Sequence, residues 1–468
     1  MSLRTKRLIM VFAVIQFLLA AGILALPRVV EALPDSYKEQ LAERSSLAAN
    51  VMDMISTPYP TLTPLDVALQ DVVIPEIQTQ PVEATATNEP TFTPEPAVES
   101  TTEVLTEEAP TSTPSPAPTA TATPTATPSP IPTVAPPPAA ASIDGLIVHP
   151  QQFNNCGPAN LSMVLTFLGR DTSQTEAADY LKPNIQDRNV SPWQMVDYVN
   201  EFMVGYSAKG FSGGDLTILK QFVSNGLPVI IEKGYDPGRG EGWYGHYLTL
   251  HSYDDEGLVF YSKDTYLGPF EVGRDRVDSY AEIIEGWRQF NYTFLVVYPD
   301  EQEELVNSIL GREYLDPITM WQNAARKAEA ETQENPEDPY AWFNLGTSLT
   351  RIGEITGDAA FYQQGASAFD RAVAIGLPGR MLWYQFRIFI AYMKMERYED
   401  MITLVDNLQG NADARVREGA QYVEELYLYK GHALAFLGNI AEARAAYEQG
   451  LALNENSYPI QWALDSIQ

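Results

Sequence analysis

The chain has 468 residues, a formal net charge of −31 at pH 7 and a single cysteine. A charge this negative excludes nucleic acid as a partner, because phosphate binding needs clustered Lys and Arg side chains. One cysteine excludes a disulfide scaffold and any zinc site built from several cysteines. The length leaves room for about two or three domains.

Residues 8–26 form an apolar run that contains one Gln and no charged residue. At about 1.5 Å per residue, such a helix just spans a bilayer core of about 30 Å. Arg4, Lys6 and Arg7 precede the run and are expected to stay cytoplasmic. We therefore predict a single-pass anchor in the cell membrane within residues 1–34, with the rest of the chain on the extracytoplasmic side. A cleaved signal peptide is the alternative.

Residues 35–142 begin with a juxtamembrane segment and continue as a tract dominated by Pro, Thr, Ala and Ser. This tract has too few large apolar residues to offset the entropy that folding removes, and its prolines favour extended backbone. The composition predicts a disordered linker that holds the following domains away from the membrane.

The single cysteine lies in the run Gln-Gln-Phe-Asn-Asn-Cys-Gly-Pro-Ala, which begins at Gln151. Leu161, Val164 and Leu165 follow at helical spacing. Cys156 therefore starts a helix, where free backbone N–H groups and the helix dipole stabilise a thiolate. A cysteine in this place is either a nucleophile or, like most free cysteines, a small buried residue.

Further helices are predicted over residues 191–202 and 215–225, each opened by a capping residue. The glycine-rich stretch 236–245 follows a buried strand and reads as a loop at the border of a cleft. We expect Trp243 or Tyr244 to be available there for contact with a substrate.

Residues 246–263 read as a β-hairpin, with Gly257 expected at positive φ in a bulged three-residue turn. In that hairpin His246 faces Asp264, and directly opposed residues have Cβ atoms about 5 Å apart. His251 lies an odd number of positions from His246 and points to the other face of the sheet. We therefore expect His251 to have a structural role.

The run at 151–159, together with the Gly-His pair at 245–246, resembles the C39-like cysteine peptidases of the papain-like superfamily. The resemblance covers roughly residues 146–300. It implies a nucleophilic cysteine, a histidine base, an orienting carboxylate and a glutamine that donates to the oxyanion. These roles fall on Cys156, His246, Asp264 and Gln151. Gln152 could equally reach the oxyanion site, although the spacing in the family favours Gln151.

In the expected triad, the Asp264 carboxylate holds the His246 ring through Nδ1 and leaves Nε2 to face Cys156 as the base. Asp264 is followed by Thr265, where members of the family usually have proline. The turn after the carboxylate is therefore expected to differ from theirs.

The remainder of the chain, residues 315–468, is helical and repetitive. Small residues such as Gly346 and Gly431 alternate with aromatic ones such as Phe369 and Tyr447. The pattern resembles tetratricopeptide repeats, in which small residues allow close helix contact and aromatic rings fill the remaining gaps.

The sequence thus predicts an α+β papain-like cysteine peptidase domain at residues 143–302 and an all-α, tetratricopeptide-like domain at residues 315–468. The predicted function is hydrolysis of peptide bonds in a peptide or protein substrate, with repeats that bind a protein partner or pack on the peptidase domain. Two alternatives remain, a catalytically idle domain in a surface adhesin or scaffold and an amidase that acts on cell-wall peptides. No metal or other cofactor is expected, because the four histidines are scattered without ligand spacing.

Overall fold

The computed structural model describes residues 60–75, 134–235, 242–266 and 275–467. The predicted membrane anchor at 8–26 lies outside these residues. Within them, every helix is too short or too polar to cross a membrane.

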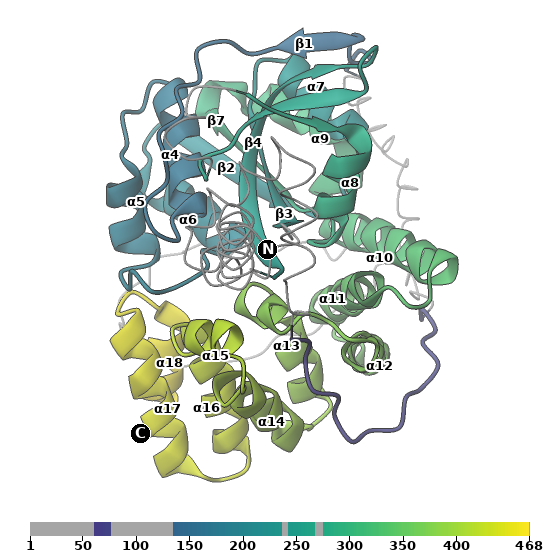
Figure 1. Ribbon diagram of the computed structural model, residues 1–468, viewed down its shortest axis with the longest axis vertical. Coiled ribbons are helices and arrows are strands. Elements are labelled where there is room, and N and C mark those ends of the chain that lie inside the picture. Colours follow the sequence, from purple (N-terminus) through teal and green to yellow (C-terminus); the bar gives the residue numbers. More distant parts are fainter. Residues whose placement is uncertain (1–59, 76–133, 236–241, 267–274, 468) are drawn as a thin grey trace, which may run out of the picture. The chain divides into compact units, whose positions relative to one another are not determined.

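An antiparallel sheet of seven strands forms the centre of the first part of the structure (Figure 1). The strands run in the order β2-β7-β3-β4-β5-β6, and β1 lies beside β4. Their bounds are β1 Ala140–Ser142, β2 Tyr206–Phe211, β3 Val229–Tyr235, β4 Tyr244–Asp254, β5 Val259–Lys263, β6 Arg276–Ser279 and β7 Phe294–Pro299.

Helices cover both faces of this sheet, because consecutive strand residues such as Ile230 and Ile231 point to opposite sides. Ile230 packs with α4, α5 and α6, whereas Ile231 packs with α7, α8 and α9, and Figure 1 shows the two groups on either side of β4. The helices are α4 Cys156–Phe167, α5 Gln174–Leu181, α6 Pro192–Phe202, α7 Leu216–Ser224, α8 Tyr280–Arg288 and α9 Glu303–Leu315. The α+β architecture predicted for this segment is therefore confirmed.

Local signals in the sequence place two of these helices correctly. Ser191 forms a capping box with Gln194 at the start of α6, and Pro192 occupies the first turn. The Asp215 side chain accepts a hydrogen bond from the backbone N–H of Ile218 at the start of α7.

The turn between β4 and β5 differs from the predicted one. Asp254 pairs with Val259, which leaves a loop of four residues, 255–258, instead of three. Positive φ occurs at Leu258 (52°) and not at Gly257, so the prediction for Gly257 was wrong. The longer loop closes with its last residue in the left-handed region, and the carbonyl of Leu258 is held there by a 2.8 Å hydrogen bond from the N–H of Tyr280.

The predicted pairing of His246 with Asp264 was also wrong in register. Leu250 lies opposite Ser262, so continuing the ladder places Tyr266, not Asp264, level with His246. A β-bulge beyond Leu250 shifts the pairing by one residue relative to the pairing near the turn. This shift keeps Asp264 on the same face of the sheet as His246, since without it Asp264 would point to the opposite face.

Part of the predicted linker at 35–142 is ordered, so the prediction of disorder was wrong for residues 60–75. Leu62 is 3% exposed, and its backbone N–H donates to the carbonyl of Leu377 over 2.8 Å. This apolar side chain supplies the burial that most of the tract lacks. Strand β1 also falls within the interval assigned to the linker and belongs to the sheet.

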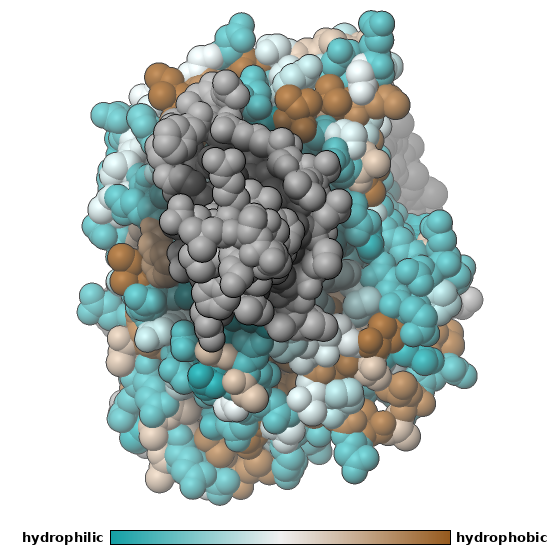
Figure 2. Space-filling view, in the orientation of Figure 1, coloured by the Kyte–Doolittle hydropathy of each residue, from teal (hydrophilic) through white to brown (hydrophobic). Residues whose placement is uncertain are grey.

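Helices make up the rest of the described chain, as predicted for this region. They are η1 Asp300–Gln302, α10 Pro317–Glu334, α11 Pro339–Thr356, α12 Ala359–Ile375, η2 Gly379–Trp383, α13 Arg387–Lys394, α14 Tyr398–Gln409, α15 Ala414–Ala420, α16 Glu424–Phe436, α17 Ile440–Leu453 and α18 Tyr458–Ser466. On the face that Figure 2 presents, hydrophobic side chains of these helices are interspersed among hydrophilic ones.

Glycines let neighbouring helices of this part approach closely. A Cβ on Gly346 would lie 2.8 Å from the ring of Phe369, and one on Gly431 would lie 2.3 Å from the ring of Tyr447. Both distances are shorter than atoms tolerate, so α11 packs against α12, and α16 against α17, only because these positions lack a side chain. The close contact predicted for small and aromatic residues is confirmed.

The helical part packs directly on the sheet domain. The rings of Trp243 and Phe290 are stacked with centroids 5.5 Å apart, and Tyr384 meets Trp243 edge to face at 5.9 Å. These side chains belong to one buried cluster that continues through α12, α13, α14 and α16. Trp243 is 3% exposed, so it is part of this junction and not a surface for substrate contact as we had expected.

Candidate active site

Cys156 is the first residue of α4, as predicted, and is a half-buried free thiol. The start of α4 lies close to its neighbours, because a Cβ on Gly157 would be 3.3 Å from the Cβ of Val190 and 3.4 Å from the sulfur of Met195. The packing fixes the position of the helix N-terminus. It thereby also fixes the backbone N–H groups of the first turn of the helix.

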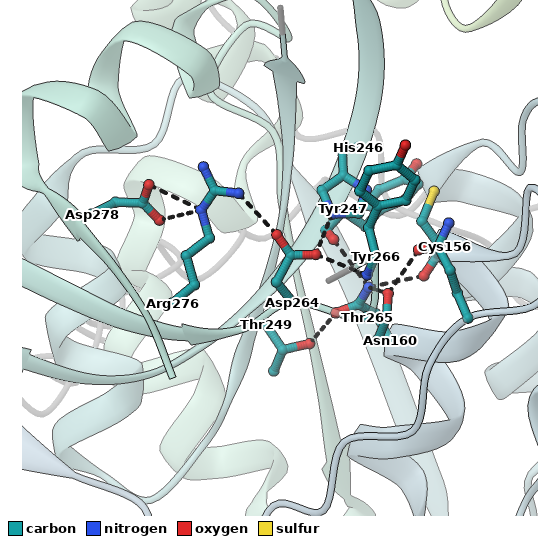
Figure 3. A network of polar contacts seen from close by, with 11 residues as sticks. Cys156, Asn160, His246, Tyr247, Thr249, Asp264, Thr265, Tyr266, Arg276 and Asp278 are labelled. Carbon is teal, nitrogen blue, oxygen red and sulfur yellow. Dashed lines mark hydrogen bonds and ion pairs between the residues drawn. The ribbon is translucent and has the colours of Figure 1, made fainter. Parts of the chain in front are cut away.

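His246 is buried in β4, and its Nε2 is 2.8 Å from Oδ1 of Asp264 (Figure 3). The structure therefore brings these two predicted residues together, but through Nε2 and not through Nδ1 as predicted. The shifted register explains the difference, since a carboxylate that approaches diagonally across the strands meets the ring nitrogen farther from the backbone. The thiol of Cys156 lines the same cavity as the His246 ring and contributes to the raised pKa of that ring.

The Asp264 carboxylate directly follows β5 and is held from several sides. Oδ1 also accepts from the backbone N–H of Tyr266 over 2.9 Å, and Oδ2 accepts from Nη1 of Arg276 over 3.0 Å. Arg276 in turn donates through Nε to both oxygens of Asp278. Burial works to raise the pKa of Asp264, but the charges and hydrogen bonds of His246 and Arg276 hold it below its ordinary value.

Sequence reasoning missed Arg276. It lies on β6, whose pairing with β5 brings it beside Asp264, and no turn or motif in the sequence announces that pairing. Arg276 and Asp278 are two positions apart in the strand, so their side chains lie on one face. This spacing alone does not show that Arg276 also contacts the carboxylate of Asp264.

The pKa of His246 reflects opposing effects. Burial works to lower it, but the charge and hydrogen bond of Asp264, together with those of Cys156, outweigh burial and raise the pKa to about 9. The raised pKa favours the imidazolium form of His246 near neutral pH. A histidine in this state can stabilise a thiolate and later donate a proton.

These shifts predict how stability depends on pH. Because folding raises the pKa of His246 from 6.5 to about 9, its contribution is complete below pH 6.5 and is lost as the pH rises through 9. The lowered pKa of Asp264 means that its contribution is present above about pH 4 and is lost as the pH falls further. Asp264→Asn should therefore lower the free energy of unfolding by about 3 kcal/mol more near pH 5.5 than near pH 9.5, measured by urea denaturation.

Asp278→Asn is the matched control. This variant also removes a carboxylate from Arg276 but none from His246. Its effect on unfolding should stay nearly constant between pH 6.5 and pH 9. Equal pH dependence in the two variants would contradict the assignment of the ionic contact to His246 and Asp264.

The two adjacent glutamines have different environments. Gln151 accepts at Oε1 from the hydroxyl of Thr265 over 2.9 Å, and it lines the same cavity as Cys156. Gln152 is exposed, and its side chain donates to the hydroxyl of Thr175 in α5. Only Gln151 is therefore placed to reach a group bound beside the thiol.

A cavity of about 300 Å³ opens at Cys156 and His246 and is lined from both parts of the structure. The sheet domain contributes Gln151, Asn154, Cys156, Arg188, Tyr244, Gly245, His246 and Tyr266, and the helical part contributes Arg380, Trp383, Tyr384, Ala414, Arg415 and Glu418. Gly245 permits this approach, because a Cβ there would lie 3.1 Å from the ring of Tyr384. Of the two aromatic residues expected at the cleft, Tyr244 lines it.

Of the other three histidines in the described ranges, His149 is exposed, whereas His251 and His432 have structural partners. His251 contacts the carbonyl of Ile143 through Nδ1 and Asp275 through Nε2, as expected for a residue on the face away from His246. His432 contacts the hydroxyl of Tyr447. Among the residues that the structure describes, no group of three or more His, Cys, Asp or Glu side chains is arranged to hold a metal ion.

Comparison with known proteins agrees with this geometry. Residues 145–294 match the model of the Peptidase_C39 like family. No curated protein matches the chain. The matched segment contains Cys156, His246 and Asp264, and it ends at the start of β7. This match supports a C39-like peptidase domain at residues 145–294.

Proposed function

We propose that this protein is a cysteine peptidase that hydrolyses peptide bonds through Cys156, His246 and Asp264. The observation that carries the proposal is that the His246 ring contacts a buried carboxylate at 2.8 Å and lines one cavity with the only thiol of the chain. This is the arrangement that nucleophilic catalysis by a thiol requires.

In the first half of the proposed reaction, the Cys156 thiolate attacks the carbonyl carbon of the scissile bond. The oxyanion accepts hydrogen bonds from the side-chain amide of Gln151 and from the backbone N–H of Cys156, which the helix itself leaves without an acceptor. Nδ1 of His246 then gives its proton to the leaving amine, and a thioester remains on Cys156.

In the second half, a water molecule attacks the thioester. His246, now neutral, takes and keeps a proton of the water, and the sulfur leaves as a thiolate when the acid product is released, which restores the starting state. Asp264 keeps the ring oriented through Nε2 in both halves and stabilises its charged form. Arg276 and the N–H of Tyr266 hold the carboxylate in place.

An idle scaffold is the competing reading, and the burial of these charges argues against it. A buried carboxylate paired with a histidine and an arginine often stabilises a fold no more than well-packed apolar side chains in the same place would. A domain without activity gains nothing from keeping such an arrangement at the mouth of a cavity.

We further propose that the helical repeats contribute one wall of the substrate site, because η2 and α15 line the cavity. A protein partner bound elsewhere on the repeats remains part of the proposal. The apolar run at 8–26 supports attachment to the cell membrane, with the peptidase and repeat domains on the extracytoplasmic side.

The test is cleavage of a peptide library by the wild type and by Cys156→Ala, with cleaved products identified by mass spectrometry. New peptide termini that require Cys156 support a peptidase. Release of ammonia or of side-chain amines without cleavage of the main chain points to an amidase. Absence of any difference between the two proteins would leave only the scaffold reading.

A further inference from the structure

A buried polar network links α4, β4 and the residues after β5 (Figure 3). Asn160, Thr249 and Thr265 are each at most 1% exposed. Buried side chains of this kind need partners, and the directions of their hydrogen bonds are constrained by what each partner can donate.

The contacts of Asn160 determine which groups of the network donate hydrogen bonds and which accept them. Its Nδ2 lies 2.9 Å from the carbonyl oxygen of Cys156 and 3.0 Å from that of Tyr247. Carbonyl oxygens only accept, so the NH2 group must face them and the amide oxygen must face the other way. The oxygen accepts there from the hydroxyl of Thr249 over 2.7 Å.

The orientation of Asn160 determines what Thr265 can do. The NH2 group of Asn160 has two hydrogens, which point to the carbonyls of Cys156 and Tyr247. Its longer contact of 3.3 Å with Oγ1 of Thr265 shares one of them. An amide NH2 group donates and does not accept. The Thr265 oxygen therefore acts as the acceptor toward Asn160, and its own proton is directed elsewhere. That proton points to Oε1 of Gln151, 2.9 Å away.

Gln151 is thus held to Thr265 at two points. Its backbone N–H donates to the Thr265 carbonyl over 2.8 Å, and its side-chain oxygen accepts from the Thr265 hydroxyl. Gln151 lines the cavity, and with Oε1 bound to Thr265 the Nε2 group is the end of the amide left to donate there. An oxyanion needs a donor at that place, because a rotated amide would present a repelling oxygen.

We propose that Thr265 is a positioning residue that sets the amide orientation of Gln151, with Asn160 fixing the direction of the hydroxyl. The inference rests on the proposed function, because it concerns the donor to the oxyanion of that reaction. It assigns a role to the position where the sequence departs from the proline expected by resemblance.

The test compares hydrolysis of p-nitrophenyl acetate by the wild type, Thr265→Val and Thr265→Ser. Valine keeps the shape and the backbone bond but removes the hydroxyl, so kcat should fall roughly tenfold with KM little changed. Serine keeps the hydroxyl and should retain most of the wild-type kcat. In the Gln151→Ala background, Thr265→Val should have less than about a twofold further effect, because the group it positions is gone.

Alkylation of Cys156 by iodoacetamide separates this role from a general structural one. Alkylation forms no oxyanion, so Thr265→Val should leave its rate unchanged. Three results would overturn this inference but not the proposed function. They are an equal loss of kcat from Thr265→Val with either Gln or Ala at position 151, a low kcat in Thr265→Ser, and a slower alkylation in Thr265→Val. Wild-type protein that does not turn over the ester through Cys156 would overturn the proposed function and this inference with it.

Discussion

Replacing His246 with alanine should lower kcat for p-nitrophenyl acetate hydrolysis by roughly 10³-fold. The variant loses the proton donor, the base and the positive charge that stabilises the thiolate, all of which reside on one ring. KM should change far less, because His246 acts mainly on the reaction and not on binding of the small ester. Steady-state kinetics on folded protein, checked by circular dichroism, measure both constants.

His251→Ala is the matched control for this prediction. His251 is also a buried histidine of β4 with a carboxylate partner, but it lies on the face away from Cys156. Its loss should reduce stability and change kcat by no more than a few-fold. Comparable loss of kcat in both variants would mean that His246 supports the fold and not the chemistry.

Replacing Gln151 with alanine should lower kcat by about 10²- to 10³-fold, which is the usual effect of removing one oxyanion donor. The adjacent Gln152 provides a control of the same residue type. Gln152→Ala removes only an exposed side chain bound to α5, so its kcat should remain near that of the wild type. If Gln152→Ala were the more damaging change, the assignment of the donor would be reversed.

Local features of the sequence predicted the cysteine helix and its neighbours well. Capping residues such as Ser191 and Asp215, and the apolar spacing after Cys156, act over a few residues, so their effect is visible without the fold. The resemblance to C39-like peptidases also pointed to His246 and Asp264, which the structure brings together although the predicted register of the hairpin was wrong.

The errors have a common physical origin in interactions between distant segments. The bulge beyond Leu250 depends on how three strands pair, and it changed both the register and the ring nitrogen that meets Asp264. Residues 60–75 are ordered because they contact the helical repeats, for example through the hydrogen bond from Leu62 to Leu377. Arg276 and Tyr384 likewise reach the site through tertiary packing, and short sequence patterns do not encode such contacts.

The central claim is that His246 activates Cys156, and alkylation by iodoacetamide as a function of pH tests it most directly. Cys156 is the only cysteine, so every alkylated thiol reports on the site. Because His246 keeps its proton until about pH 9, the wild type should react rapidly and almost uniformly between pH 7 and pH 9, and His246→Ala should slow the reaction near pH 7. A wild-type rate that rises only near pH 8.5, where an ordinary thiol ionises, and that is indifferent to His246→Ala would contradict the account.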